Sequence, residues 1–170
     1  ITVNTAEGDN LMIHKAIDMA QPGDVIVVNA HGCKTRSVVG EMMVRHAAAR
    51  GVTGFIVDGM TRDPEGIRQA GIPVFSLGSI ILGSHRNGPG EINVPISCGG
   101  TVVMPGDIVI GDTEGIVVLR PDDAADIVSA ARKKHEQELD KRKKYKSGAV
   151  SASNRDWIDR TLTEKNVPVL

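Results

Sequence analysis

Apolar side chains recur with helical spacing in the first third of the chain. In residues 9–20, "DNLMIHKAIDMA", Asp9 or Asn10 can cap a helix whose apolar face is made by five side chains (Met12, Ile13, Ala16, Ile17, Ala20). Residues 38–50, "VVGEMMVRHAAAR", repeat this spacing, and Gly51 can end the helix. The sequence therefore predicts two amphipathic helices before residue 52.

Short apolar runs alternate with these helices. "VIVVN" (25–29) is continuous and β-branched, as expected of a strand covered on both faces, and "AHGCKTRS" (30–37) follows it as a predicted loop. "GFIVD" (54–58) predicts the next strand, "PEGIRQAG" a short helix, and "IPVFSLG" (72–78) another strand. Because helix and strand alternate from residue 9 to 77, the pattern predicts a parallel βαβ sheet.

The pattern changes after this region. Residues 83–100 are rich in glycine and proline, and three short β-branched runs separated by tight turns follow them (101–104, 108–112, 116–120). These runs predict a small antiparallel β unit. Residues 121–146 predict a long helix, and residues 154–165 a last short one, in which we expect Trp157 to pack against this chain or a neighbouring subunit.

Composition narrows the class of protein. Hydrophobic residues make up 41% of the 170 residues but aromatic ones only 2%, so the core must consist of aliphatic side chains. Two cysteines, Cys33 and Cys98, provide no disulfide framework and favour a reducing compartment. No apolar run approaches the roughly 20 residues that span a bilayer, and no signal peptide is visible. We therefore expect a cytoplasmic protein.

Charge gives two open interpretations. The net charge of −1 provides no overall attraction to nucleic acid or membrane, and we predict neither as a partner. Residues 132–146, however, hold eight Lys or Arg against three acids. Such a helix can contact RNA or a membrane surface, although a solvated helix with cations near its negative end is the simpler interpretation.

The candidate chemistry begins with Arg62 and Asp63, which follow the predicted strand at 54–58. Ligands of open α/β sheets bind outside the carboxyl ends of the strands. Arginine binds carboxylates with two parallel hydrogen bonds, and aspartate is a hard oxygen ligand suited to Mg²⁺ or Mn²⁺. We expect the two neighbours to contact different groups rather than each other. Taken alone, they are also compatible with two surface loop charges.

A second candidate lies at the start of the helix predicted over 38–50. Gly40 leaves backbone N–H groups accessible there, and the helix dipole favours an anion, while Glu41 can serve a capping role. In a βαβ unit this loop and the loop holding Arg62 can meet at one edge of the sheet. A ligand that has a carboxylate and a second oxygen able to chelate a metal fits the helix start and the Arg62–Asp63 loop together. A small 2-oxo acid has these groups.

Four stretches resemble the RraA-like family: "VGEMM", "GFIVDGMTRD", "GDNLMIHKAIDMAQPGDVIVV" and "INVPISCGGTVVMPGDIVIGDTEGIVVL". The resemblance covers most of residues 8–132. This family includes class II, metal-dependent pyruvate aldolases that cleave 4-hydroxy-4-methyl-2-oxoglutarate or 4-carboxy-4-hydroxy-2-oxoadipate and decarboxylate oxaloacetate. It also includes a regulator of ribonuclease activity, which binds ribonuclease E and is not an aldolase. That regulatory role is the alternative function, whereas a methyltransferase lacks support because no G-x-G-x-x-G turn follows a strand.

The resemblance implies an α/β fold, namely a β/β/α sandwich of the swivelling-domain type with a parallel βαβ core and a small antiparallel β unit. We expect a single domain over residues 1–170, with its core at about 8–132 and a C-terminal helical extension at 133–170. Members of the family assemble as trimers or hexamers with sites between subunits. The resemblance therefore implies a homotrimer or homohexamer.

Site residues follow by position from the same resemblance. Arg62 would bind the ketone and carboxylate oxygens of the substrate, Asp63 would ligate Mg²⁺ or Mn²⁺ directly, and Glu41 would hold metal-bound water. The substrate carboxylate would lie on the backbone amides at the helix start (Gly40, Glu41, Met42, Met43). Arg62 and the metal would then polarise the ketone and stabilise the pyruvate enolate as the C3–C4 bond breaks.

One departure from the family pattern concerns the metal. Aldolases of the family often carry an acid three residues after the Arg-Asp aspartate, where this chain has Gly66, although Glu65 lies one residue earlier. We expect a further acid from a neighbouring subunit, with Glu136 and Glu138 as candidates. His85 and Arg86 could contact a second substrate carboxylate, or belong to a glycine-rich crossing loop. His31 and Cys33 are weak metal candidates.

Overall fold

The computed structural model describes residues 1–147 and 155–168, which fall into two compact units, Ile1–Pro121 and Asp122–Leu170. This division lies closer to the N-terminus than the predicted start of the extension at residue 133. Parts of that extension lie outside the described residues, namely 148–154 and 169–170. They include Asn154, where the last helix was predicted to begin.

The first unit is built on a five-stranded sheet in the order β4-β3-β2-β1-β5. Strands β1 to β4 run parallel, and β5 pairs antiparallel with β1 at the edge. The elements of this part are β1 (Thr2–Thr5), α1 (Leu11–Met19), β2 (Val25–Val39), α2 (Glu41–Ala49), β3 (Gly54–Thr61), α3 (Pro64–Gln69), β4 (Val74–Ser79) and β5 (Gly90–Ile92).

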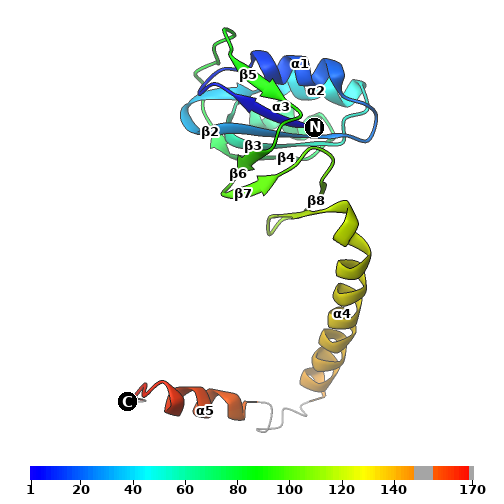
Figure 1. The fold of residues 1–170 in the computed structure, drawn as a ribbon, viewed down its shortest axis with the longest axis vertical. Coiled ribbons are helices and arrows are strands. Elements are labelled where there is room, and N and C mark those ends of the chain that lie inside the picture. Colours follow the sequence, from blue (N-terminus) through cyan, green and yellow to red (C-terminus); the bar gives the residue numbers. More distant parts are fainter. Residues whose placement is uncertain (148–154, 169–170) are drawn as a thin grey trace. The chain divides into compact units, whose positions relative to one another are not determined.

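The three connecting helices share one face of this sheet. Parallel strands that lie side by side in chain order, joined by crossovers of one hand, place their helices on the same side. Ile13 of α1, Val44 of α2 and Ile67 of α3 accordingly belong to one buried cluster, which also contains Phe55 of β3. Figure 1 shows α1 and α2 side by side along this face.

The other face of the sheet is covered by two β-hairpins. They consist of β6 (Ile96–Cys98), β7 (Thr101–Val103), β8 (Ile108–Gly111) and β9 (Ile116–Leu119). Side chains alternate along β2, so that Ile26 and Val28 join the helix-side cluster while Val27 packs with Ile96 and Val103 on the hairpin side. The unit has three layers, which confirms the predicted β/β/α sandwich with a parallel core (Figure 1).

Strand β2 differs from its prediction because it includes residues 30–37, which were predicted to be a loop. The register shows why the pattern misled. Asn29 pairs with Asp58 and Cys33 with the next residue of β3, so three residues of β2 have no counterpart there. His31 has φ 56° and Gly32 φ 66°, which turns the chain out of the ladder and back. A strand with such excursions lacks the alternation expected of a strand.

Other strands were also missed by the sequence. Residues 2–5 form β1, and the glycine- and proline-rich stretch holds β5 and β6. The predicted antiparallel unit is two separate two-stranded ladders rather than one. All of these strands have only three or four residues, which is too short for a periodicity to be read.

The second unit is helical. A 3₁₀ turn at Pro121–Asp123 leads into α4 (Ala124–Lys146), and α5 spans Asp156–Glu164. No residue of α4 is buried, and Trp157 on α5 is 62% exposed, so its packing against a neighbouring subunit stays a prediction. Among the described residues, no helix combines the length and the apolar character needed to cross a membrane.

Candidate active site

The two predicted motifs meet where β2 and β3 end. Val39 and Thr61, the last residues of these neighbouring parallel strands, are paired, and the amide of Arg62 donates to the Val39 carbonyl at 3.0 Å. Gly40 and Arg62 follow directly. The sheet register therefore brings the start of α2 and the Arg62–Asp63 dipeptide to one edge.

Two glycines make room for the Arg62 side chain. A Cβ on Gly40 would lie 3.1 Å from Cγ and Nε of Arg62, and one on Gly83 would lie 3.0 Å from its Nη1. Gly40 has extended backbone angles that any residue can adopt, so its small size rather than its φ is what the site uses. The Arg62 side chain stays 49% exposed, and its guanidinium is therefore accessible to a ligand.

Arg62 and Asp63 also contact each other, contrary to the sequence expectation. The Nε of Arg62 lies 3.4 Å from Oδ2 of Asp63. Asp63 has φ 57° and ψ 52°, in the left-handed region, which lets adjacent side chains turn to the same side. A non-glycine residue in this region is uncommon and often marks a functional position.

Glu41 lies over the glycine that replaces the expected acid. Its Oε1 accepts a hydrogen bond from Nε of Arg45 at 2.7 Å, one helical turn along α2. A Cβ on Gly66 would overlap the Glu41 carboxyl group. The absence of a side chain at position 66 thus gives Glu41 its place near the start of α3.

The start of α2 provides backbone donors. The amides of Met43 and Val44 both donate to the Gly40 carbonyl at 3.1 Å, as the first hydrogen bonds of the helix. The amides of Glu41 and Met42 precede these bonds, so they are the donors open to an anion at the positive end of the helix dipole. Met42 is 74% exposed, whereas Met43 is buried.

A cavity of about 460 Å³ opens beside these groups. Its wall includes five of the candidate residues, Gly40, Met42, Met43, Arg62 and Arg86, but neither Asp63 nor Glu41. The remaining lining residues are Asn10, His14, Ser37, Val38, Val39, His46, Gly83 and Ser84. No aspartate or glutamate lines this cavity, so its polar wall is neutral or positively charged.

The residues near Asp63 fit a hard divalent cation only in part. Asp63 has a carboxylate, the ligand type that Mg²⁺ and Mn²⁺ prefer, and its side chain is 53% exposed. Glu41 has a second carboxylate at the start of α2, where its Oε1 pairs with Arg45. Across residues 1–147 and 155–168, no three His, Cys, Asp or Glu side chains converge as a metal site. This donor set suits a cation that keeps several waters, which Mg²⁺ usually does. His31 and Cys33 do not line the cavity.

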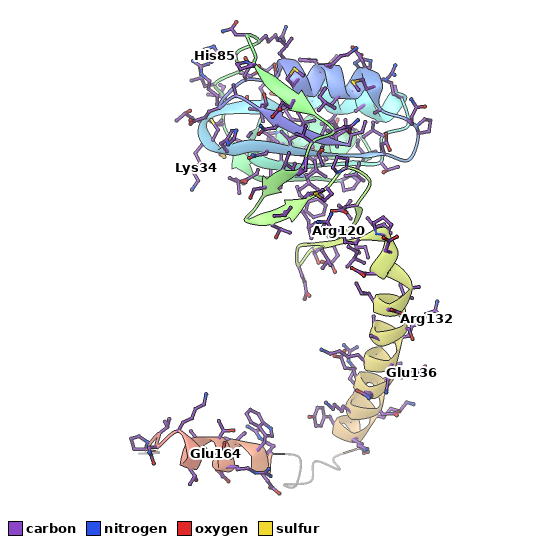
Figure 2. All side chains as sticks on the ribbon, viewed as in Figure 1. Lys34, His85, Arg120, Arg132, Glu136 and Glu164 are labelled. Carbon is purple, nitrogen blue, oxygen red and sulfur yellow. The ribbon has the colours of Figure 1, made fainter. Side chains whose placement is uncertain are left out.

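The other predicted residues are placed as follows. Glu65 accepts hydrogen bonds from Arg68 at 2.7 Å and Gln69 at 3.1 Å, so its carboxylate is engaged along α3. Arg86 lines the cavity, but His85 does not, and it lies at the outer edge of the first unit (Figure 2). Glu136 and Glu138 are exposed on α4 in the second unit.

Sequence reasoning missed several polar residues of the cavity wall, among them Asn10, His14, Ser37 and His46. The two histidines are 32 positions apart and lie on different helices, so no ligand spacing linked them. Burial lowers the pKa of His14, and the positive charges of Arg86 and His46 lower it further, while Asp18 opposes them. The lowered pKa of His14 could be inferred only from the structure, in which α1 and α2 bring His14 and His46 to one cavity.

Comparison with known proteins gives a consistent family. Residues 1–118 match the RraA-like model, described as Aldolase/RraA. The chain is 42% identical over 133 residues to a Halalkalibacterium halodurans protein whose name proposes it to be a 4-hydroxy-4-methyl-2-oxoglutarate aldolase. That match covers 78% of this chain and 63% of the relative, so the chain spans less than two thirds of that relative's length.

Solved structures share the fold under differing names. An unusual member of the RNase ES inhibitor RraA protein family from Streptomyces coelicolor superposes with a TM-score of 0.76 at 29% identity, over 84% of this chain and 75% of that one. A Geobacillus kaustophilus protein named an S-adenosylmethionine:2-dimethylmenaquinone methyltransferase superposes with a TM-score of 0.68 at 30% identity, over 73% and 78%. The fold alone therefore does not select the activity.

Proposed function

The chain belongs to the RraA-like family, and we propose that it is a divalent-metal-dependent pyruvate aldolase. Its substrates are of the 4-hydroxy-4-methyl-2-oxoglutarate or 4-carboxy-4-hydroxy-2-oxoadipate type, and it also decarboxylates oxaloacetate. The observation that carries this proposal is the meeting of Arg62, Asp63 and the start of α2 at one sheet edge, beside a cavity without acids. The name of the Halalkalibacterium halodurans relative supports the same activity.

Recognition of the 2-oxo acid uses groups that the backbone fixes in advance. The amides of Glu41 and Met42 bind the carboxylate, and Arg62 donates to its second oxygen and to the ketone. Gly40 and Gly83 keep the space around the guanidinium open, since a Cβ at either position would lie about 3 Å from it. These donors are rigid because β2, β3 and α2 are tied together by backbone hydrogen bonds.

Bond breaking places negative charge on the ketone oxygen. Arg62 stabilises that charge as the C3–C4 bond of the substrate breaks and the enolate of pyruvate forms. Asp63 and Glu41 would hold a Mg²⁺ or Mn²⁺ ion, which acts as a Lewis acid toward the 2-oxo acid when bound. A solvent molecule near Arg62 takes the proton of the C4 hydroxyl, and C4 leaves as a carbonyl group. In oxaloacetate the C3–C4 bond breaks with loss of CO₂. In both reactions the enolate then takes a proton from solvent at C3 and becomes pyruvate.

Pyruvate release tests the proposal. The purified protein is incubated with 4-hydroxy-4-methyl-2-oxoglutarate or oxaloacetate, with Mg²⁺ or with excess chelator, and pyruvate is measured with lactate dehydrogenase. We expect release with Mg²⁺ and loss of that release with chelator. If neither substrate gives pyruvate above the metal-only rate, the chain is not an aldolase.

A regulatory function is the second candidate, favoured by one observation. Residues 132–146 of α4 hold eight Lys or Arg against three acids, and no residue of this helix is buried. Such a surface suits an acidic partner or an enzyme that processes RNA. A chain that fails the pyruvate assay but binds and inhibits a ribonuclease E-type enzyme would support this function instead.

A further inference from the structure

The cavity beside Arg62 has a second group of basic side chains. His14 lies on α1, His46 on the last turn of α2, and Arg86 in the segment between β4 and β5. The charges of Arg86, Asp18 and His46 act on His14. The aldolase proposal uses Arg62 but none of His14, His46 and Arg86, which line the same cavity.

We propose that His14, His46 and Arg86 form a subsite for the distal carboxylate of a dicarboxylic 2-oxo acid. The inference rests on the proposed function, since the 2-oxo end of the substrate is assigned to Arg62 and the amides of α2. It adds the residues that select a substrate with a second carboxylate over a monocarboxylic one.

The subsite is preorganised because its wall is anchored on both sides of Arg86. The Ser37 amide donates to the Leu82 carbonyl at 2.8 Å, and Nη1 of Arg36 donates to the Gly83 carbonyl at 2.6 Å. The Asn10 amide donates to the His85 carbonyl at 3.0 Å. Beyond Arg86, the amides of Asn87 and Gly88 donate to the Asp9 carboxylate. The backbone around Arg86 is thus held against the sheet and the start of α1.

Two polar atoms of the cavity residues lack partners. Oδ1 of Asn10 and Nε2 of His14 are buried and make no hydrogen bond among the described residues. Buried polar atoms without a partner are rare and call for a ligand or water. Asn10 itself is only 4% exposed, and its Nδ2 faces the Met43 sulfur at 3.4 Å, which leaves its oxygen for another donor. A carboxylate would accept from Nε2 of His14 when that nitrogen is protonated, and a bound water would donate to Oδ1 of Asn10.

Charge and size agree with a dicarboxylate. No acid lines the cavity, so nothing in its wall repels an anion, and Arg62 and Arg86 attract one. An anion that binds beside His14 also favours the charged form of its imidazole. A volume of about 460 Å³ lies in the range of small-molecule sites. Because arginine and imidazolium make charge-assisted hydrogen bonds to carboxylates, loss of two of them should cost substantial affinity.

The test compares two ligands that share a 2-oxo acid end. Pyruvate has one carboxylate, whereas 2-oxoglutarate adds a distal carboxylate and has no C4 hydroxyl to be cleaved. Calorimetry with Mg²⁺ measures both affinities for the parent chain and for a His46→Gln/Arg86→Gln double variant. His46 and Arg86 are exposed, so the variant should fold. Lys15→Gln is the control, because Lys15 is an exposed cation of α1 outside the cavity wall.

We expect the parent and the Lys15 variant to bind 2-oxoglutarate about tenfold more tightly than pyruvate. The double variant should lose this preference and keep its pyruvate affinity. In the parent, NMR should show the pKa of His14 rising when 2-oxoglutarate binds but not when pyruvate binds, because only a nearby anion stabilises the imidazolium.

Three results would overturn the inference. If the parent bound pyruvate and 2-oxoglutarate with equal affinity, the cavity would have no subsite for a distal carboxylate. The aldolase proposal would still stand. A preference that persists in the double variant would assign the distal carboxylate to other residues. If the parent bound neither ligand, the proposed function itself would fail, and this inference with it.

Discussion

Gly66 leaves room for the side chain of Glu41. The family's aldolases often carry an acid at the position of Gly66, and the structure explains the glycine, because a Cβ there would overlap the Glu41 carboxyl group. Glu41 instead reaches over α3 from the start of α2 and pairs with Arg45. The carboxyl group of Glu41, from a neighbouring element, thus occupies the space beside position 66.

Gly66→Ala tests this placement of Glu41. The methyl group should displace the flexible end of Glu41 and weaken its pairing with Arg45, an exposed ion pair that contributes only about 0–1 kcal/mol to stability. We therefore expect a nearly unchanged melting temperature and Mn²⁺ affinity several-fold weaker, measured by electron paramagnetic resonance. Glu65→Gln, which removes an acid engaged along α3, should leave Mn²⁺ affinity as in the parent. Unchanged Mn²⁺ affinity in the Gly66 variant would show that Glu41 does not help to hold the metal.

Asp63 should be the least replaceable side chain of the site. Asn tolerates the left-handed backbone at this position, so Asp63→Asn removes the charge without adding backbone strain. We expect a folded protein whose kcat/KM for oxaloacetate falls by roughly 10²–10⁴, since a Lewis-acid metal contributes several kcal/mol. Near-parent turnover that still depends on Mg²⁺ would show that the ion is held elsewhere.

At the scale of elements, Asp9 joins the start of α1 to the segment that forms the cavity wall. One carboxylate oxygen accepts from the Leu11 amide at 2.8 Å, and the other accepts from the amides of Asn87 and Gly88. Burial opposes ionisation of Asp9, but these three amides and the charge of His85 outweigh it and lower the pKa of Asp9. A single buried carboxylate thus holds together two parts of the chain far apart in sequence.

Asp9→Asn should destabilise the first unit. The amide group cannot accept all three hydrogen bonds, which costs about 1–3 kcal/mol at pH 7. Because the folded pKa lies below the unfolded value of about 3.9, the carboxylate stabilises the fold above that value and stops doing so as pH falls through the folded pKa. Urea unfolding should therefore show a parent–variant gap at pH 7 that narrows toward pH 2. A gap of constant size would mean that the charge of Asp9 plays no part.

At the scale of the whole molecule, the hairpin layer exposes apolar side chains. Val102 of β7 is 60% exposed, and Ile110 of β8 and Val117 of β9 are each 55% exposed. Among the described residues no three potential metal ligands converge, so a complete metal site needs an acid from elsewhere. Together with this, the apolar surface supports the expectation of a symmetric homotrimer or a pair of trimers. A neighbouring copy could then supply the missing acid, with Glu136 and Glu138 as the candidates (Figure 2 labels Glu136 on α4).

Sedimentation velocity tests this assembly. We expect a trimer or hexamer at micromolar concentration, and specific activity that falls when dilution dissociates it, because a shared site is lost with its interface. The matched variant is Val117→Lys, which places a charge on the exposed apolar surface and should favour the monomer. A monomer with full activity at nanomolar concentration would rule out a site shared between subunits.

The sequence by itself determined the helices, the parallel core and the pairing of Gly40 with Arg62. These three features depend on short stretches of sequence and on the order of the elements along the chain. The spacing of apolar residues sets the helices, and strand ends that follow each other in a βαβ unit are neighbours in any such sheet. The resemblance to the RraA-like family, carried by ordered blocks along the chain, is confirmed for the same reason.

Only the tertiary structure decided the contact between Arg62 and Asp63, the course of β2, and the group formed by His14, His46 and Arg86. The contact between Arg62 and Asp63 depends on a left-handed backbone at Asp63, which no sequence pattern predicts. The excursions of β2 depend on its register with β3. The group of His14, His46 and Arg86 depends on how α1 and α2 pack on the sheet and where the Asp9 carboxylate holds residues 87 and 88. Periodicity reports only which face of a segment is buried, whereas these arrangements join side chains distant in sequence through packing and hydrogen bonds.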